Sequence, residues 1–91
     1  MTVKMGIPAA FRRFTGHNAD VELEADTLAM ALERLFERFP EIKEHLMDDA
    51  GQLRRFVNIY VNQEDIRLLD GLQTRLQAGS QIRIIPAIAG G

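Results

Sequence analysis

Hydrophobic and polar residues alternate in two stretches near the start of the chain, at 2–8 and 21–25. In each stretch the apolar residues fall on one face, and they are Val3, Met5, Ile7, Val21, Leu23 and Ala25. A period of two is typical of a half-buried strand. The segment between them includes the turn formers of residues 14–20 and is longer than a tight turn. We therefore predict two antiparallel strands joined by a long connection.

The period changes from two to 3.6 after the second strand. Apolar residues recur at i, i+4, i+7, i+8 and i+11, namely Leu28, Leu32, Leu35, Phe36 and Phe39. This spacing predicts an amphipathic helix. Asp26 or Thr27 can accept hydrogen bonds from the free amides at the helix start, and Pro40 ends the helix. Pro40 can also open a short second helix over residues 41–47.

The second half of the chain contains the clearest strand, in which the inward residues are Val57, Ile59 and Val61. Polar residues 62–65 interrupt it, and we expect residues 66–68 to form a short partner strand. The last strand is expected over 81–85, with Ile82 and Ile84 facing inward.

The predicted order is strand, strand, helix, strand, short strand, strand. A mixed sheet of about four to five strands packed on one main helix buries the helix stripe, which indicates an α+β protein of the β-grasp arrangement. The chain has 91 residues, which leaves no room for a second core. We expect residues 1–86 to form this domain and residues 87–91 to form a flexible C-terminal tail.

The composition and charge of the chain exclude several kinds of functional site and partner. The chain has a net charge of −2 and no cysteine, which excludes disulfides, thiolate nucleophiles and cysteine-based metal sites. Its only basic pairs are Arg12–Arg13 and Arg54–Arg55, and a nucleic-acid partner usually needs a more concentrated basic face. No apolar run reaches the ~18 residues of a membrane span, and the start of the chain does not resemble a signal peptide. We expect a cytoplasmic protein with neither nucleic-acid nor membrane partners.

Histidines and paired carboxylates are the other candidates for chemistry, at His17, His45, Glu22/Glu24 and Asp48/Asp49. The two histidines fall in different elements with no cysteine beside them, whereas a structural zinc site needs four ligands. An acid–base dyad needs a pocket that desolvates one carboxylate, and the pattern places these pairs on a strand face and in a loop. We expect no metal site and no catalytic group.

The end of the chain is its most informative segment. Pro86 follows the last strand and precedes five mostly small residues, which are Ala87, Ile88, Ala89, Gly90 and Gly91. Two glycines leave the terminal carboxylate without neighbouring side chains, so it can pass through a narrow channel. Five extended residues reach roughly 17 Å, far enough to enter the active site of a partner. A carboxylate is a poor electrophile until it is activated, for instance as an acyl-adenylate, and this chain has no phosphate-binding loop for ATP.

Two segments resemble the ThiS/MoaD family of ubiquitin-like sulfur carriers, at 55–67 (RFVNIYVNQEDIR) and 78–91 (AGSQIRIIPAIAGG). The resemblance covers essentially the whole chain. It implies that Gly91 is adenylated by an E1-like adenylyltransferase and converted to a thiocarboxylate. Gly90 then adds no side chain where the tail enters the active site of the partner. It also implies a protein cosubstrate that has no activity of its own and binds no cofactor, while the activating partner uses ATP.

Within the family, residues 46–62 are most similar to carriers of the cysteine-biosynthesis type (CysO-like). Those carriers pass sulfur to a cysteine synthase-like enzyme, and a metallopeptidase then releases the product. Alternatives are the small subunit of molybdopterin synthase, with the large subunit as partner, and a ubiquitin-like modifier or interaction module. Small subunits of molybdopterin synthase often have paired prolines before the tail, whereas only Pro86 stands here, and Ser80 replaces an aspartate common in the family.

A docking surface for the partner is expected on the outer face of the sheet. If the inward residues of the last strands fill the core, the outer face holds Phe56, Tyr60, Arg83 and Ile85. Apolar residues gathered on a surface indicate a contact site. The tail is expected to emerge beside this face.

Overall fold

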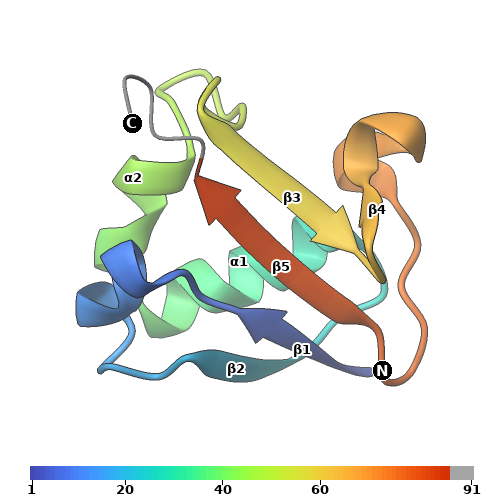
Figure 1. Cartoon of the computed structure of the whole chain (residues 1–91), viewed down its shortest axis with the longest axis horizontal. Helices are drawn as coiled ribbons and strands as arrows, with labels where there is room; N and C mark the ends of the chain where they lie inside the picture. Colours follow the sequence, from blue (N-terminus) through green and yellow to red (C-terminus); the bar gives the residue numbers. More distant parts are fainter. Residues whose placement is uncertain (87–91) are drawn as a thin grey trace.

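A five-stranded sheet in the order β2-β1-β5-β3-β4 is the framework of the structure (Figure 1). The computed structural model describes residues 1–86. β1 (Thr2–Gly6) pairs antiparallel with β2 (Asp20–Glu24) and parallel with β5 (Gln81–Pro86). β3 (Val57–Val61) pairs antiparallel with both β5 and the two-residue β4 (Glu64–Asp65). The mixed sheet confirms the predicted α+β class and β-grasp arrangement.

The principal helix α1 (Leu28–Arg38) packs on one face of this sheet (Figure 1). Of the two candidate caps, Thr27 takes the role, because its hydroxyl accepts a hydrogen bond from the Met30 amide at 3.2 Å. The helix ends before Pro40, which opens a 3-10 turn (Pro40–Ile42) followed by the short helix α2 (Lys43–Leu46). The expected second helix is therefore present but begins with a 3-10 turn. None of the helices in residues 1–86 has the length and apolar character to cross a bilayer.

The core lies between α1 and the inner face of the sheet. All the predicted inward strand residues are buried, and they are Val3, Met5, Ile7, Val21, Leu23, Ala25, Val57, Ile59, Val61, Ile82 and Ile84. The helix contributes Leu28, Leu32 and Leu35, together with Ala31, which the predicted stripe did not include. Phe36 and Phe39 are only half-buried and pack at the margin of the core.

The predicted partner strand at 66–68 is wrong. β4 begins earlier, at Glu64, because Asn62 and Gln63 adopt φ values of 50° and 75° and turn the chain within two residues. Residues 66–68 instead form a 3-10 turn, which is capped by the Asp65 carboxylate through the Arg67 amide at 2.9 Å.

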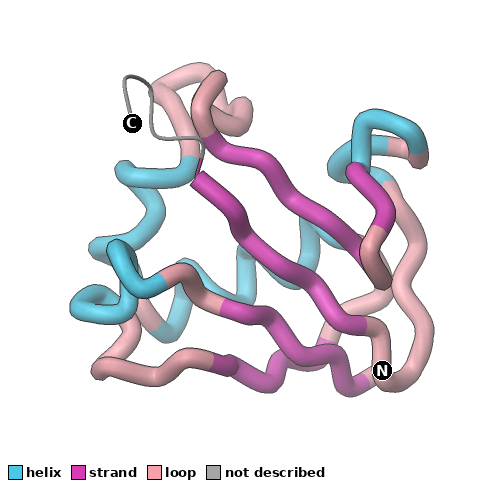
Figure 2. The backbone as a smooth tube through the Cα atoms, viewed as in Figure 1, coloured by secondary structure: helices cyan, strands magenta, loops and turns pink. Residues whose placement is uncertain are grey.

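β5 lies at the centre of the sheet, with β1 on one side and β3 on the other (Figure 2). It extends one residue beyond its expected end, since Pro86 is still in register with Val57. The predicted tail, residues 87–91, lies outside the residues that the structure describes.

Candidate functional site

The last strand delivers the chain to the predicted tail from a firmly held position. β5 pairs with β1 as far as Arg83 and with β3 as far as Pro86. Its inward side chains, Ile82 and Ile84, are buried in the core. The strand that leads to Pro86 is therefore held by its pairing with β1 and β3 and by the packing of Ile82 and Ile84. The predicted thiocarboxylate site Gly91 and the approach residues Ala87, Ile88, Ala89 and Gly90 follow beyond it, outside the described part of the chain.

Part of the predicted docking surface comes together on the outer face of the sheet. Tyr60 and Arg83 are directly opposite each other in the β3–β5 register, and Ile85 follows Arg83 on the same face. Phe56 immediately precedes β3, whose first residue pairs with Pro86. Phe56 and Ile85 are 43% and 42% exposed, so each leaves a large apolar surface in water. We call these four residues (Phe56, Tyr60, Arg83 and Ile85) the outer patch.

A hollow of about 430 Å³ opens on the sheet between this patch and the start of β2, and the prediction did not include it. Its lining includes Gly6, Pro8, Arg12, Asp20, Arg83 and Pro86. A Cβ at Gly6 would be in ordinary van der Waals contact with the Ile82 carbonyl oxygen at 3.7 Å and with the Arg83 Cγ and an Asp20 carboxylate oxygen at 3.9 Å, so the missing side chain adds its volume to the hollow. The sequence signal was a glycine at an outward position of the first alternating stretch.

The two histidines lie in different environments. His45 stacks on the Phe14 ring with a centroid separation of 4.3 Å, so it serves as a packing residue at the end of α2. His17 lies in the turn before β2 with a φ of 66°. Within residues 1–86 no three histidine, aspartate or glutamate side chains are grouped to hold a metal ion.

The carboxylate pairs are engaged in local structure. Glu24 accepts a hydrogen bond from the Thr2 hydroxyl, and this bond together with the N-terminal ammonium lowers the pKa of Glu24. Asp48 accepts hydrogen bonds from the Ala50 and Gln52 amides at 2.9 and 3.0 Å, which stabilise its loop. Neither arrangement desolvates one carboxylate beside another, as an acid–base dyad requires.

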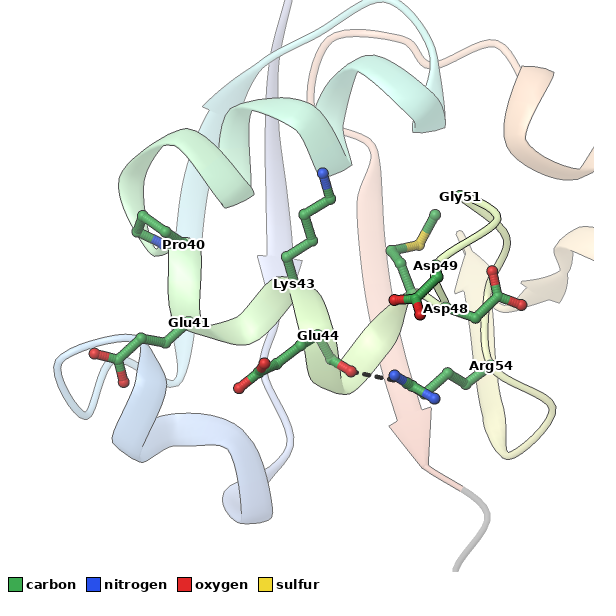
Figure 3. A pocket seen from close by; sticks show the side chains of 9 residues that line it. Pro40, Glu41, Lys43, Glu44, Asp48, Asp49, Gly51 and Arg54 are labelled. Carbon is green, nitrogen blue, oxygen red and sulfur yellow. Dashed lines mark hydrogen bonds between the residues drawn. The ribbon is translucent and has the colours of Figure 1, made fainter.

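Asp48 and Asp49 belong to an open hollow of about 550 Å³ between α2 and the following loop (Figure 3). Arg54 closes one side, where its Nε donates to the Glu44 carbonyl at 2.8 Å. The charged side chains in this hollow spread along its rim instead of converging on one point (Figure 3). The hollow therefore has the character of a solvated surface groove.

Comparison of the chain with known proteins identifies its family. The ThiS family model matches residues 5–91. The chain belongs to the ThiS family. ThiS-family relatives include the sulfur carrier protein CysO of Mycobacterium tuberculosis, which is 43% identical over 93 residues that cover all of both chains.

Solved structures agree with this membership. The CysO chain in the BexX/CysO complex of Amycolatopsis orientalis is 36% identical, with a TM-score of 0.90 over 98% of this chain and 99% of that one. The small archaeal modifier protein 1 of Methanosarcina acetivorans is 27% identical, with a TM-score of 0.88 over 99% of this chain and 96% of that one. The ThiS-family fold thus extends over the whole described domain.

Proposed function

We propose that this chain is a sulfur carrier in cysteine biosynthesis, with Gly91 as the residue that holds the sulfur. The observation that carries the proposal is the full-length similarity to the sulfur carrier protein CysO, at 43% identity over all of both chains. That similarity extends through residues 87–91 as well as the folded domain. The chain acts as a protein cosubstrate and supplies no catalytic group of its own.

Activation of Gly91 is the task of an E1-like adenylating partner. The Gly91 carboxylate attacks the α-phosphate of ATP, pyrophosphate leaves, and an acyl-adenylate forms. A hydrosulfide ion, supplied by the sulfur source through the partner, then attacks the acyl carbon, AMP leaves with the C–O bond electrons, and the S–H proton is lost. The product is a thiocarboxylate, a sulfur nucleophile attached to a protein. Attachment raises its local concentration at the active site of a docked acceptor.

The acceptor in this proposal is a cysteine synthase-like enzyme that holds an activated serine. The thiocarboxylate sulfur forms a bond to the serine β-carbon, and the activating group leaves. The product is a thioester, and the cysteine amino group attacks its carbonyl, so that a peptide bond to Gly91 forms and the thiol is freed. Hydrolysis of this peptide bond by a metallopeptidase then releases cysteine and restores the Gly91 carboxylate. A cytoplasmic location, where the acceptor and ATP are available, belongs to the same proposal.

The outer patch is the surface that we assign to these partners. Its two exposed apolar side chains, Phe56 and Ile85, belong to residues next to the Val57–Pro86 pair at the end of β5, so a partner docked there lies beside the residue from which the tail continues. Arg83, opposite Tyr60, adds a cation at the end of the patch that is farther from Pro86. The relative in the BexX/CysO complex shows that a carrier of this kind assembles with another protein.

Deletion of Gly91 tests the central claim. The chain is incubated with ATP, the E1-like partner and a sulfur source, and intact mass is measured. We expect the wild-type chain to gain the mass difference between sulfur and oxygen and the deleted chain to gain nothing. The free energy of unfolding in urea should be equal in both, because the buried core lies within residues 1–86. Sulfur loading of the deleted chain would contradict the assignment of Gly91.

A second candidate is a ubiquitin-like modifier, which the similarity to small archaeal modifier protein 1 favours. In that case the activated Gly91 would form an isopeptide bond with a lysine of another protein. Mass spectrometry of tryptic peptides from the native host distinguishes the two. A lysine that bears the C-terminal remnant of this chain supports the modifier, whereas thiocarboxylate and its cysteine adduct support the carrier.

A further inference from the structure

β2 forms one edge of the sheet and pairs only with β1 in the described structure (Figure 2). We propose that this edge is a second docking site, which takes an extended segment of a partner protein with cationic side chains at alternate positions. The inference concerns a surface other than the outer patch and does not depend on the chemical state of Gly91.

The backbone of β2 presents hydrogen-bonding groups away from the sheet. The Ile7 amide donates to the Ala19 carbonyl at 2.7 Å, and the Ala25 amide donates to the Met1 carbonyl at 2.9 Å. In an antiparallel pair such positions alternate, so the odd-numbered residues of β2 bond to β1. The amides and carbonyls of residues 20, 22 and 24 therefore face outward. These are the groups that an added strand uses.

One of these outward groups is already engaged by a side chain. The Arg38 guanidinium at the end of α1 donates to the Glu22 carbonyl at 3.0 Å. The same guanidinium lies 5.3 Å from the centroid of the Phe39 ring. Arg38 occupies the place that a backbone amide of an added strand would take. An added strand therefore has to displace Arg38 from the Glu22 carbonyl, and until then Arg38 limits unwanted strand pairing at this edge.

The side chains along the edge give the charge of the expected occupant. Asp20, Glu22 and Glu24 are exposed on the outer face at alternate positions, about 6.8 Å apart. Lys4 lies opposite Glu22 in the β1–β2 register, and Glu24 already accepts from the Thr2 hydroxyl and lies 3.6 Å from the N-terminal ammonium, so a bound cation competes with these groups. An added strand places its own side chains about 4.5–5.5 Å from theirs, where opposite charges are favourable. Its intervening side chains face the side of α1, beside the half-buried Phe39, and we expect them to be apolar.

The surface beside the edge has room for another chain. A hollow of about 520 Å³ runs along it, lined by Lys4, Asn18, Asp20, Val21, Glu22 and Arg38. A second copy of this protein fits poorly, because two β2 edges would bring like charges together. Since β1 separates β2 from β5, the edge lies about 9.6 Å from the tail strand. A partner there leaves the outer patch uncovered.

Amide hydrogen exchange followed by NMR tests the proposal on the full chain. The probe is a seven-residue peptide of alternating arginine and valine, and the control is a peptide of the same composition with its arginines in one block. With the alternating peptide at ten times its Kd, exchange at the outward amides of Glu22 and Glu24 should slow about tenfold. Equal effects of the two peptides would overturn the proposal, because diffuse charge attraction does not require alternation.

Three variants separate strand pairing from charge. Glu22→Pro removes the outward amide but keeps the neighbouring bonds to β1, so the protection at Glu24 should be lost. Glu22→Gln keeps the amide and should weaken binding several-fold. Glu33→Gln makes the same charge change on the exposed face of α1 and should leave binding unchanged. Circular dichroism checks the fold of each. Should the proline variant unfold, the comparison of Glu22→Gln with Glu33→Gln still decides, and equal weakening by both contradicts the site.

Discussion

Asn62 stabilises the turn after β3 in two ways. It adopts a left-handed backbone conformation with a φ of 50°, which asparagine tolerates better than most residues. It also binds the start of β5. Its backbone amide donates to the Gln81 carbonyl at 2.8 Å, and its side-chain Oδ1 accepts from the Gln81 backbone amide at 2.9 Å. One residue therefore sets both the hairpin and the position of the strand that leads to the tail.

Replacement of this side chain should be costly. We expect Asn62→Ala to lower the free energy of unfolding by about 2 kcal/mol, because it removes a hydrogen bond and leaves a Cβ residue in the left-handed region. Asn62→Gly also loses the side-chain hydrogen bond, but glycine adopts the left-handed conformation without strain, so the loss of stability should be smaller. Urea denaturation of both variants measures the two contributions. An alanine variant as stable as wild type would contradict this role.

Asp65 makes the stability of the fold depend on pH. Its carboxylate is 15% exposed and lies 2.6 Å from the Arg67 guanidinium. The hydrogen bonds from the Arg67 side chain and amide lower the pKa of Asp65. The ionised carboxylate thus stabilises the fold above its unfolded-state pKa, and this contribution is lost as the pH falls through the lower folded-state pKa.

Asp65→Asn should therefore be less stable than wild type at neutral pH, and the difference should shrink in acid. Chemical denaturation at neutral pH and at a pH below the folded-state pKa gives both values. Arg67→Ala should reduce the same pH dependence, since it removes the guanidinium partner. A stability difference that stays constant over this range would show that the ion pair is not its source.

At the scale of the element, the two faces of β5 carry different functions. Ile82 is 1% exposed in the middle of the core, whereas Ile85 is 42% exposed on the outer face. We expect Ile82→Ala to lower the free energy of unfolding by about 2–5 kcal/mol, because it leaves a cavity. Ile85→Ala should change it by no more than about 0.5 kcal/mol. Urea denaturation compares them, and a large loss for Ile85→Ala would show that this residue belongs to the core.

At the scale of the whole molecule, the fold separates stability from recognition. The core lies between α1 and the inner face of the sheet, while the proposed partner contacts lie on the outer face beside the end of β5. A change on the outer patch should therefore affect partner binding without affecting folding.

Sulfur loading by the E1-like partner tests this separation. Arg83→Ala should raise the KM for the carrier about fivefold, the equivalent of about 1 kcal/mol, and should leave kcat nearly unchanged. Arg34→Ala removes the same charge from the exposed side of α1 and serves as the matched control. Equal KM values for Arg83→Ala and wild type would place the docking surface elsewhere.

Much of this protein could be predicted from the order of its residues. The inward strand positions and the helix start follow from periods of two and 3.6, since these periods are set by local backbone geometry. The Gly90–Gly91 end indicated a terminus that can enter the active site of a partner, because this access depends on the absence of side chains and not on packing, and the resemblance to the ThiS/MoaD family implied the carrier function.

Other features were decided only by the tertiary structure. The strand predicted at 66–68 failed because the left-handed turn at 62–63 brought the chain back two residues earlier. The hollow over Gly6, the opposition of Tyr60 and Arg83, and the contact between Arg38 and the β2 edge all join residues far apart in the sequence. Periodicity assigns a residue to a face of its own strand or helix. Which neighbour it meets there depends on strand order and register, and these are fixed only when the whole sheet closes over α1.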